Sequence, residues 1–242
     1  MTYNGNGSTG GSVPVDSTNY EAGAMVTVAD NTGNLIKIPP AGTGEAFKFG
    51  GWNTQADGNG TNYTAGSGTF VITSNTTLYA KWIPYALRDV GPAGGLIFYD
   101  KGSYSAGWRY LEAAPSDQGT GGIQWYNGSY TATGATATAV GTGQANTTMI
   151  VTSQGAGSYA AQLCNDLSIG SYSDWFLPSK DELGFMYTNL KEYGVGGFPA
   201  AYYYWSSSED GTNLAWAQAF ATGGWNNVYK YYNNRVRAAR AF

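Results

Sequence analysis

The sequence predicts an α+β chain in which a small all-β module, residues 1–82, precedes a mixed module, residues 83–242. Three observations lead to this fold class. Only 12% of the residues are charged and Gly, Ser, Thr, Asn and Tyr are plentiful, which is typical of short strands joined by many turns. Short β-prone segments bounded by turn residues recur along the chain. Two segments in the second half carry apolar residues at helical spacing.

Three strands are predicted in the first module. Residues 25–28 and 69–73 are β-prone, and turn clusters such as 31–34 and 57–60 separate the extended segments. Residues 77–82 alternate apolar and polar side chains, as a half-buried strand does. We therefore expect this module to be all-β.

Four segments of the first module have a recognisable order and spacing. They are Tyr3–Ser8, Phe49–Thr54, Gly60–Tyr63 and Thr76–Trp82. Together they resemble the Listeria–Bacteroides repeat of internalin B and many other bacterial surface proteins. The resemblance implies a small β-grasp-like fold that serves as a stalk or spacer, often in tandem. It implies no ligand for this module, so we expect a spacer.

The second module begins at Ile83, where the Ile83-Pro84 step is a predicted boundary because the residue before a proline favours extended structure over helix. Residues 96–100 and 108–114 are predicted strands, since bulky apolar residues are bounded there by turns. Residues 115–158 are rich in Gly, Thr and Ala without a sustained period, so we expect long loops. Loops of this length in a compact domain are usually functional or poorly ordered.

Two helices are predicted next. Apolar residues recur at helical spacing from Ala160 to Leu167. A second helix begins at Ser179, which has the spacing of a capping box with Glu182. Asp181 and Glu182 are alternatively a pair of catalytic carboxylates, but the cap and the helix dipole already account for acidic residues at this position.

The last forty residues predict a hairpin and a final strand. Residues 215–220 alternate with a period of two, Gly223-Gly224 favours a tight turn, and residues 225–232 form a return strand. Residues 235–242 are predicted to be one last strand.

The alternation over 215–220 assigns faces to its side chains. It places Trp216 and Phe220 on a core face, and it places Ala217, Ala219 and Ala221 on the opposite, outward face.

The tail is also rich in tyrosines that are difficult to bury together: Tyr202, Tyr203, Tyr229, Tyr231 and Tyr232. Tyrosine offers rigid contact area with a hydroxyl, while Asn and Ser supply adaptable hydrogen bonds, so this composition is typical of binding surfaces. The alternative is that these residues simply face solvent on a polar sheet.

Four motifs of the second module occur in a fixed order: Gly107–Glu112, Asp174–Leu183, Tyr204–Glu209 and Arg235–Arg237. They resemble the family typified by the C-terminal domain of the Legionella collagen-like adhesin, over about residues 86–242. The resemblance implies a C-type lectin-like domain of the formylglycine-generating-enzyme subtype. Those enzymes work through a pair of cysteines, whereas this chain has only Cys164, so their activity is not implied.

The tail alternates bulky framework residues with small, polar and tyrosine residues, and it resembles the variable proteins of diversity-generating retroelements. In these proteins, adenine-specific mutagenesis alters AAY codons, which never yield Trp, Glu, Gln, Lys or Met. The resemblance implies a fixed framework of Trp205, Glu209, Trp216, Gln218, Trp225 and Lys230. The predicted ligand-binding positions are Tyr202, Tyr203, Asp210, Gly211, Asn213, Leu214, Ala217, Ala219, Ala221, Thr222, Gly224, Asn226, Asn227, Tyr229, Tyr231, Tyr232 and Asn233.

Composition excludes several kinds of chemistry. The chain has no histidine, which removes the commonest general base and most catalytic zinc sites. Its net charge of −4 argues against nucleic acid as a partner. We expect Cys164 to be a small core residue, and we expect no catalytic residue, cofactor or metal site. The calcium-dependent sugar motifs of animal C-type lectins are missing, although a structural calcium ion remains open.

We therefore expect a surface-displayed protein that binds a protein or glycan on another cell or on a phage host, with Tyr229, Tyr231 and Tyr232 as anchors. It is expected on the bacterial cell surface or on a phage particle. The alternatives are a fixed glycan-binding adhesin and an enzyme of unusual chemistry. We find no export signal and no segment for direct membrane insertion, so the sequence is expected to begin inside a longer protein. The alternative is export by a signal that the sequence does not reveal.

Overall fold

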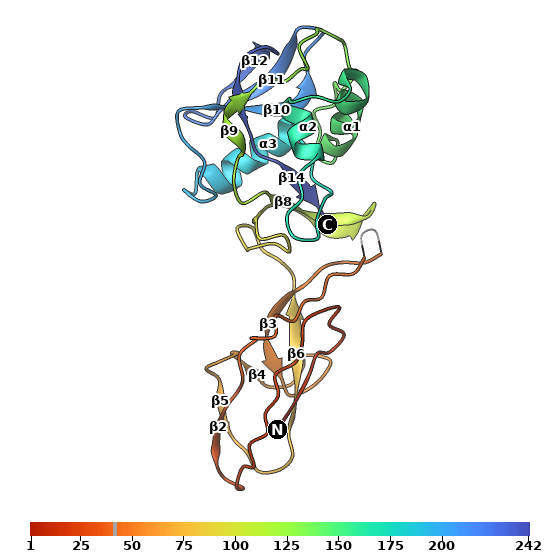
Figure 1. Ribbon diagram of the computed structural model, residues 1–242. Helices are drawn as coiled ribbons and strands as arrows, with labels where there is room; N and C mark the ends of the chain where they lie inside the picture. Colours follow the sequence, from red (N-terminus) through yellow and green to blue (C-terminus); the bar gives the residue numbers. More distant parts are fainter. Residues whose placement is uncertain (41–42) are drawn as a thin grey trace. The chain divides into compact units, whose positions relative to one another are not determined.

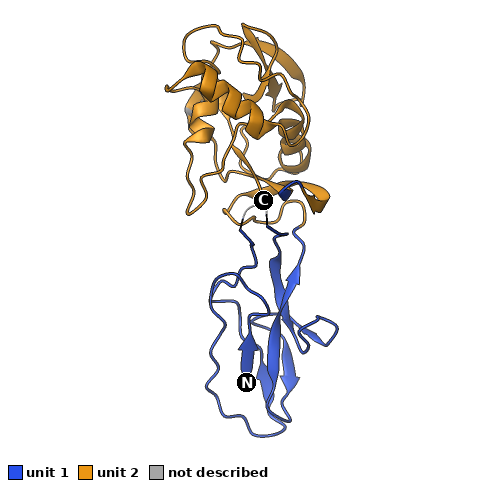
Figure 2. Ribbon diagram, turned by 90° about the vertical axis from the view of Figure 1, so that its right-hand side faces the viewer, with its two compact units in different colours: residues 1–85, 106–108 blue, residues 86–105, 109–242 orange. Residues whose placement is uncertain are grey.

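The computed structural model describes residues 1–40 and 43–242 (Figure 1). Strands take 32% of the chain and helices 13%, so the protein is β-rich with few helices. The chain divides into two compact units (Figure 2). Unit 1 comprises residues 1–85 and 106–108, and unit 2 comprises residues 86–105 and 109–242.

The described part of unit 1 consists of short strands. They are β1 (Thr2–Asn4), β2 (Met25–Thr27), β3 (Lys48–Asn53), β4 (Asn62–Tyr63), β5 (Thr69–Val71) and β6 (Thr77–Ile83). A four-stranded sheet has the order β1-β6-β3-β4, with β1 and β6 parallel and the other neighbours antiparallel. Strands β2 and β5 form a separate antiparallel pair. The strands predicted at 25–28, 69–73 and 77–82 are confirmed.

Trp52 is the centre of the core of unit 1. Its ring is fully buried and packs against Tyr3, with 4.6 Å between the ring centroids. The indole N–H donates to the carbonyl oxygen of Ala29 at 2.8 Å, so the buried polar atom has a partner. The preceding Gly51 has a left-handed φ of 112°, and a Cβ there would lie 2.6 Å from the carbonyl oxygen of Tyr63. Both the conformation and the space therefore require glycine.

Unit 2 combines two sheets with three α-helices in its described residues. The strands are β7 (Leu96–Ser105), β8 (Trp108–Ala113), β9 (Gln118–Ile123), β10 (Tyr203–Glu209), β11 (Leu214–Ala219), β12 (Trp225–Tyr229), β13 (Asn234–Val236) and β14 (Ala239–Ala241). The helices are α1 (Gly143–Gln154), α2 (Ala160–Asn165) and α3 (Lys180–Met186), and a π-helical turn, η1 (Tyr187–Lys191), continues α3. One sheet has the order β12-β11-β10-β13-β9 and the other β14-β8-β7.

Helices cover both faces of the five-stranded sheet. Helices α1 and α2 lie side by side (Figure 1) and share a core with the sheet, in which Ile150 and Cys164 pack with Trp205 and other buried residues. On β11, Trp216 points to the face opposite this core. Lys180, at the start of α3, lies over the Trp216 ring with its Nζ 3.4 Å from the centroid. Helix α3 therefore packs on the second face.

The two predicted helices are confirmed as α2 and α3. In α3 the Ser179 side chain accepts the N–H of Glu182 at 3.3 Å, and the Glu182 carboxylate accepts the N–H of Ser179 at 2.7 Å. The same carboxylate accepts the N–H of Gly141 at 2.8 Å, so the capping box also anchors the loop before α1.

The prediction of continuous loops over residues 115–158 is wrong, because β9 and the twelve-residue α1 lie within them. The buried positions of α1 do recur at helical spacing, but two of them are the polar residues Asn146 and Thr147. Asn146 donates to the carbonyl oxygen of Ala137 at 2.7 Å, and Thr147 accepts the N–H of Leu177 at 3.0 Å. A search for apolar periodicity misses a helix whose inner face is polar and hydrogen-bonded.

The single last strand predicted over 235–242 is also wrong. The segment divides into β13, which pairs with β10 and β9, and β14, which pairs with β8 in the other sheet. Arg237 and Ala238 lie between them and are both buried. The chain end therefore joins the two sheets of unit 2.

Candidate functional site

The β11–β12 hairpin forms one edge of the five-stranded sheet, with β12 as the edge strand. Its register pairs Gln218 with Trp225 across the turn. Gly223 fixes the turn, since its φ of 77° is left-handed and its N–H donates to the carbonyl oxygen of Ala219 at 2.7 Å. A Cβ at Gly223 would lie 2.7 Å from the Tyr187 ring, so a side chain has neither the conformation nor the space it needs.

A buried ion pair ties the tail to the loop that precedes α1. Lys230 is fully buried and donates to the Glu209 carboxylate and, at 2.8 Å, to the carbonyl oxygen of Thr212. Glu209 also accepts the N–H of Thr133 at 3.0 Å, and the Trp125 ring lies 4.5 Å from the Lys230 ammonium. Burial lowers the pKa of Lys230, and the Glu209 carboxylate opposes that shift. A pair held on this many sides fixes the geometry around it.

The other predicted framework residues are also inside the structure or half-covered. Trp205 and Gln218 are buried. Trp216 and Trp225 are half-buried, and the Nζ of Lys180 lies 3.4 Å and 5.4 Å from the centroids of the two rings. Each residue that the codon argument assigned to a fixed framework is therefore buried or half-buried.

Most of the predicted ligand-binding residues are on the surface. Thirteen of the seventeen are exposed: Tyr202, Tyr203, Gly211, Asn213, Ala221, Thr222, Gly224, Asn226, Asn227, Tyr229, Tyr231, Tyr232 and Asn233. Asp210, Leu214 and Ala219 are half-buried, and Ala217 is fully buried.

The prediction that Ala217 faces outward is wrong. Ala217 lies directly opposite Trp205 in the β10–β11 register, and directly opposed residues point to the same face of a sheet. Because Trp205 fills the core beneath α1 and α2, only a small side chain fits beside it. The assignment of faces failed because the bulky Trp216 is the half-exposed one, while Ala215 and Ala217 lie inside.

Hydrogen bonds connect some of the predicted ligand-binding side chains. Asn226 donates to the Tyr203 hydroxyl at 3.2 Å, and Asn227 donates to the Asp210 carboxylate at 2.9 Å. Successive residues of a strand point to opposite faces, so these two pairs lie on opposite sides of β12. The predicted ligand-binding positions therefore lie on both sides of the edge strand. The sequence had suggested that they share one outward face.

An exposed tyrosine cluster continues from the end of β12. The rings of Tyr229 and Tyr231 stack with 5.6 Å between centroids, and those of Tyr231 and Tyr232 are 4.5 Å apart. Tyr126 and Tyr130, 5.0 Å apart, come from the loop before α1, and Tyr130 interacts electrostatically with Tyr229 and Tyr231. A hydrogen bond to Tyr232, followed by desolvation and the neighbouring phenols, raises the pKa of Tyr231 to about 12.

Sequence reasoning missed Tyr126 and Tyr130. They are about a hundred positions before the tail, and nothing in their neighbourhood marks them as part of the same surface. The only pointer was the general expectation that the loops within 115–158 are functional.

Other reactive groups have structural partners. Glu182 is occupied by the capping box, whereas Asp181 is exposed on α3, so the two do not converge as catalytic carboxylates. Burial raises the pKa of the Cys164 thiol, which is fully buried in the core. Within residues 1–40 and 43–242, no group of three or more Asp, Glu or Cys residues is placed to hold a metal ion. Nor does any helix in these ranges have the length and apolarity needed to cross a membrane.

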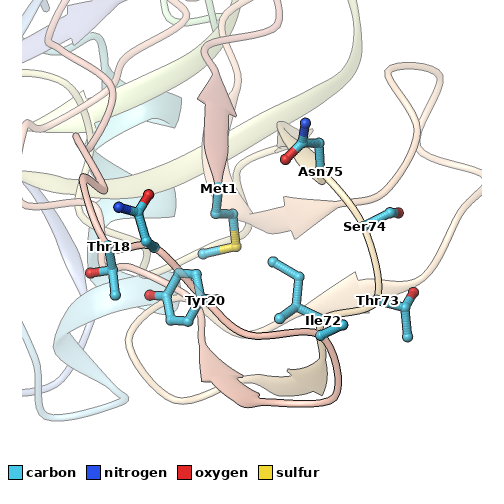
Figure 3. A pocket seen from close by; sticks show the side chains of 9 residues that line it. Met1, Thr18, Tyr20, Ile72, Thr73, Ser74 and Asn75 are labelled. Atoms are coloured by element: carbon cyan, nitrogen blue, oxygen red, sulfur yellow. The ribbon is translucent and has the colours of Figure 1, made fainter.

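Unit 1 has a small pocket beside Met1 (Figure 3). The side chains of Met1, Tyr20 and Ile72 converge there, and Thr18 and Asn75 supply part of its polar rim. Its lining includes no Asp, Glu, Lys or Arg side chain to orient a ligand. All of the predicted ligand-binding residues lie in unit 2, so the candidate site is placed there.

Residues 1–81 match the family model of the Listeria-Bacteroides repeat domain. This confirms the resemblance predicted for the N-terminal module, and within the repeat domain the Gly-Gly-Trp motif supplies the core tryptophan and the glycine that it requires. The match covers about a third of the chain and lies within unit 1. The comparison with curated proteins gave no match.

Proposed function

We propose that unit 2 is a noncovalent ligand-binding domain with a C-type lectin-like fold, whose ligand contacts the β12 edge and the loops beside it. The proposal rests on one observation: two sets of residues in the tail differ in their exposure to solvent. Thirteen of the predicted contact positions are exposed, while the interleaved Trp, Glu, Gln and Lys residues are buried or half-buried. Contact residues can then change without disturbing the core.

The exposed tyrosines support binding as the role of this surface. Tyr229, Tyr231 and Tyr232 are between 40% and 50% exposed although each carries a large ring, and Tyr130 adds a fourth ring at 42%. Exposed clusters of large aromatic groups are typical of interaction sites, since their rings lose little conformational entropy on binding. The ligand is a protein or a glycan on another cell or on a phage host.

We further propose that the exposed positions vary by retroelement mutagenesis. The residues at these positions are ones that AAY codons yield, and the framework residues are ones that such codons never yield. With Ala217 removed from the set because it is buried, the remaining variable positions avoid the fully buried core.

Sequencing codons 202–242 from many cells of the source population tests this mechanism. We expect substitutions at the exposed positions only, together with a near-identical adenine-rich template beside a reverse-transcriptase gene. Identical tails in all cells, with no such template, would contradict it.

The repeat domain supports a position outside the cell, because this repeat is found in surface proteins. We propose that unit 1 is a β-grasp-like spacer that displays unit 2 on a bacterial surface or a phage particle. Protease shaving of intact cells should then release unit 2, and retention of unit 2 inside washed, intact cells would argue against display.

A fixed glycan-binding adhesin is the second candidate, favoured by the exposed tyrosine rings, which are able to stack on sugar rings. A glycan array distinguishes a fixed adhesin from a protein with a variable ligand surface. Strong binding to one glycan by the whole protein, combined with invariant tails, would favour the adhesin. We propose binding in preference to catalysis because the buried carboxylates of Glu182 and Glu209 are already engaged by backbone N–H groups.

A further inference from the structure

A hollow in unit 2 lies beside β13. It has a volume of about 480 Å³ and is lined by Ser116, Asp117, Gly121 and Pro199, together with Arg235 and Arg237 of the last motif. A Cβ built on Gly121 would have no atom within 4 Å, so the space beside this residue is open. The hollow therefore has room for a small molecule next to two guanidinium groups.

The charges around this hollow do not balance. Arg235 donates to Asp117 at 3.1 Å, and Arg237 binds the same carboxylate at 2.7 Å. The Tyr204 hydroxyl also donates to it at 2.8 Å. Among the described residues, two guanidiniums thus share one carboxylate, and the cluster keeps one surplus positive charge. A partly buried charge without a counter-charge is unfavourable, so an anion in the hollow would stabilise the cluster.

The two arginines differ in what they still offer. Arg237 is 2% exposed and also donates to the carbonyl oxygens of Ala114 and Gly196, at 3.2 Å and 2.7 Å. The side chain of Arg235 is 20% exposed, and its Nη1 donates to Asp117. Its Nε is buried and has no hydrogen-bond partner among the described residues. Arg235 is therefore the more accessible of the two guanidiniums at the hollow, and not all of its N–H groups are used.

Tyr202 connects this mouth to the proposed ligand surface. Its ring covers the Arg235 guanidinium at 4.1 Å and is itself 46% exposed. Stacking covers one face of the guanidinium, whereas hydrogen bonds to an acceptor form in the plane of the group.

We propose that this hollow binds a carboxylate group, held by Arg235. A carboxylate matches the guanidinium edge with two parallel N–H···O bonds, and it supplies the negative charge that the cluster lacks. The inference goes beyond the proposed function, because it requires neither a variable tail nor the ligand of the β12 edge.

The test is a titration of the whole protein with sodium acetate, followed by the Nε–Hε NMR resonance of Arg235. Sodium chloride at equal ionic strength is the reference. We expect a saturable shift with acetate and a much smaller one with chloride. Glucuronate should bind at least as tightly as acetate, while glucose, which lacks the carboxylate, should not bind. No saturable shift, or equal shifts with chloride or glucose, would overturn the proposal.

Two variants complete the test. Arg235→Gln should weaken acetate affinity by at least tenfold, measured by calorimetry, with its fold checked by circular dichroism. Lys191→Gln, which removes one positive charge in η1 outside the lining of the hollow, should bind acetate like the parent protein. Equal weakening in both variants would show only a general charge effect and would reject the site. Because acetate is a small anion that probes only the hollow, a negative result would not count against the proposed ligand surface at β12.

Discussion

Replacing Lys230 with methionine removes the cation of the buried ion pair and should strongly destabilise unit 2. The Glu209 carboxylate would remain buried, at 4% exposure, without its counter-charge. Loss of one partner of a buried pair costs about 3–5 kcal/mol. The lower end applies here, about 3 kcal/mol, because Glu209 keeps its hydrogen bonds from Thr133 and Gly134 and methionine still packs against Trp125.

Urea unfolding, followed by near-ultraviolet circular dichroism of the unit 2 tryptophans, measures this change in the free energy of unfolding. The double variant Glu209→Gln with Lys230→Met should regain part of the loss, since it leaves no unpaired charge. A single variant within about 0.5 kcal/mol of the parent protein would refute the reasoning. So would a double variant that loses the sum of both single effects, because the pair would then have no coupling.

Three further predictions follow from the same structure. Ala217→Asn should lower the free energy of unfolding by about 1–3 kcal/mol, because it forces a larger polar group into a filled core. Asn226→Ala on the exposed edge should change the free energy of unfolding by less than about 0.5 kcal/mol. Urea unfolding measures both changes. The Tyr231 phenol should ionise at a pKa of about 12, and Tyr232→Phe should move that pKa back toward the ordinary tyrosine value; NMR of labelled tyrosine carbons would contradict this if the variant titrates unchanged. Burial raises the pKa of Glu182, so the native state keeps the proton of this carboxyl group to higher pH than the unfolded chain does. The stability that this proton contributes is complete below the unfolded pKa of about 4.3 and is lost as pH rises through the folded pKa. Unfolding measured across this range should therefore show a smaller pH slope in Glu182→Gln, and an unchanged slope would count against the shift.

Local signals in the sequence predicted several elements correctly. The capping box of Ser179 and Glu182 fixed the start of α3, and the apolar spacing from Ala160 located α2, because both signals depend only on neighbouring residues. The order and spacing of four segments identified the repeat domain, and one of them contains the buried Trp52 next to Gly51, whose conformation requires glycine.

Features that depend on distant residues were not predictable. Helix α1 was missed because its inner face carries Asn146 and Thr147, whose hydrogen-bond partners come from other segments. Ala217 was assigned to the wrong face because its surroundings are set by Trp205 on the neighbouring strand. Alternation along one strand gives two faces, but it does not tell which of them the rest of the fold covers. Tyr130 was missed for a similar reason, because only the tertiary structure brings it to the tyrosine cluster.

The most direct measurement of the central claim compares the folding of two codon libraries. One library randomises the thirteen exposed positions of the tail with NNY codons, where N is any base, and the other randomises the six framework positions. Proteolysis of displayed library members, followed by sequencing, gives the fraction of each library that folds. If the exposed positions form an exchangeable surface on a fixed framework, most members of the first library survive and few of the second do. Equal survival of the two libraries would contradict the account.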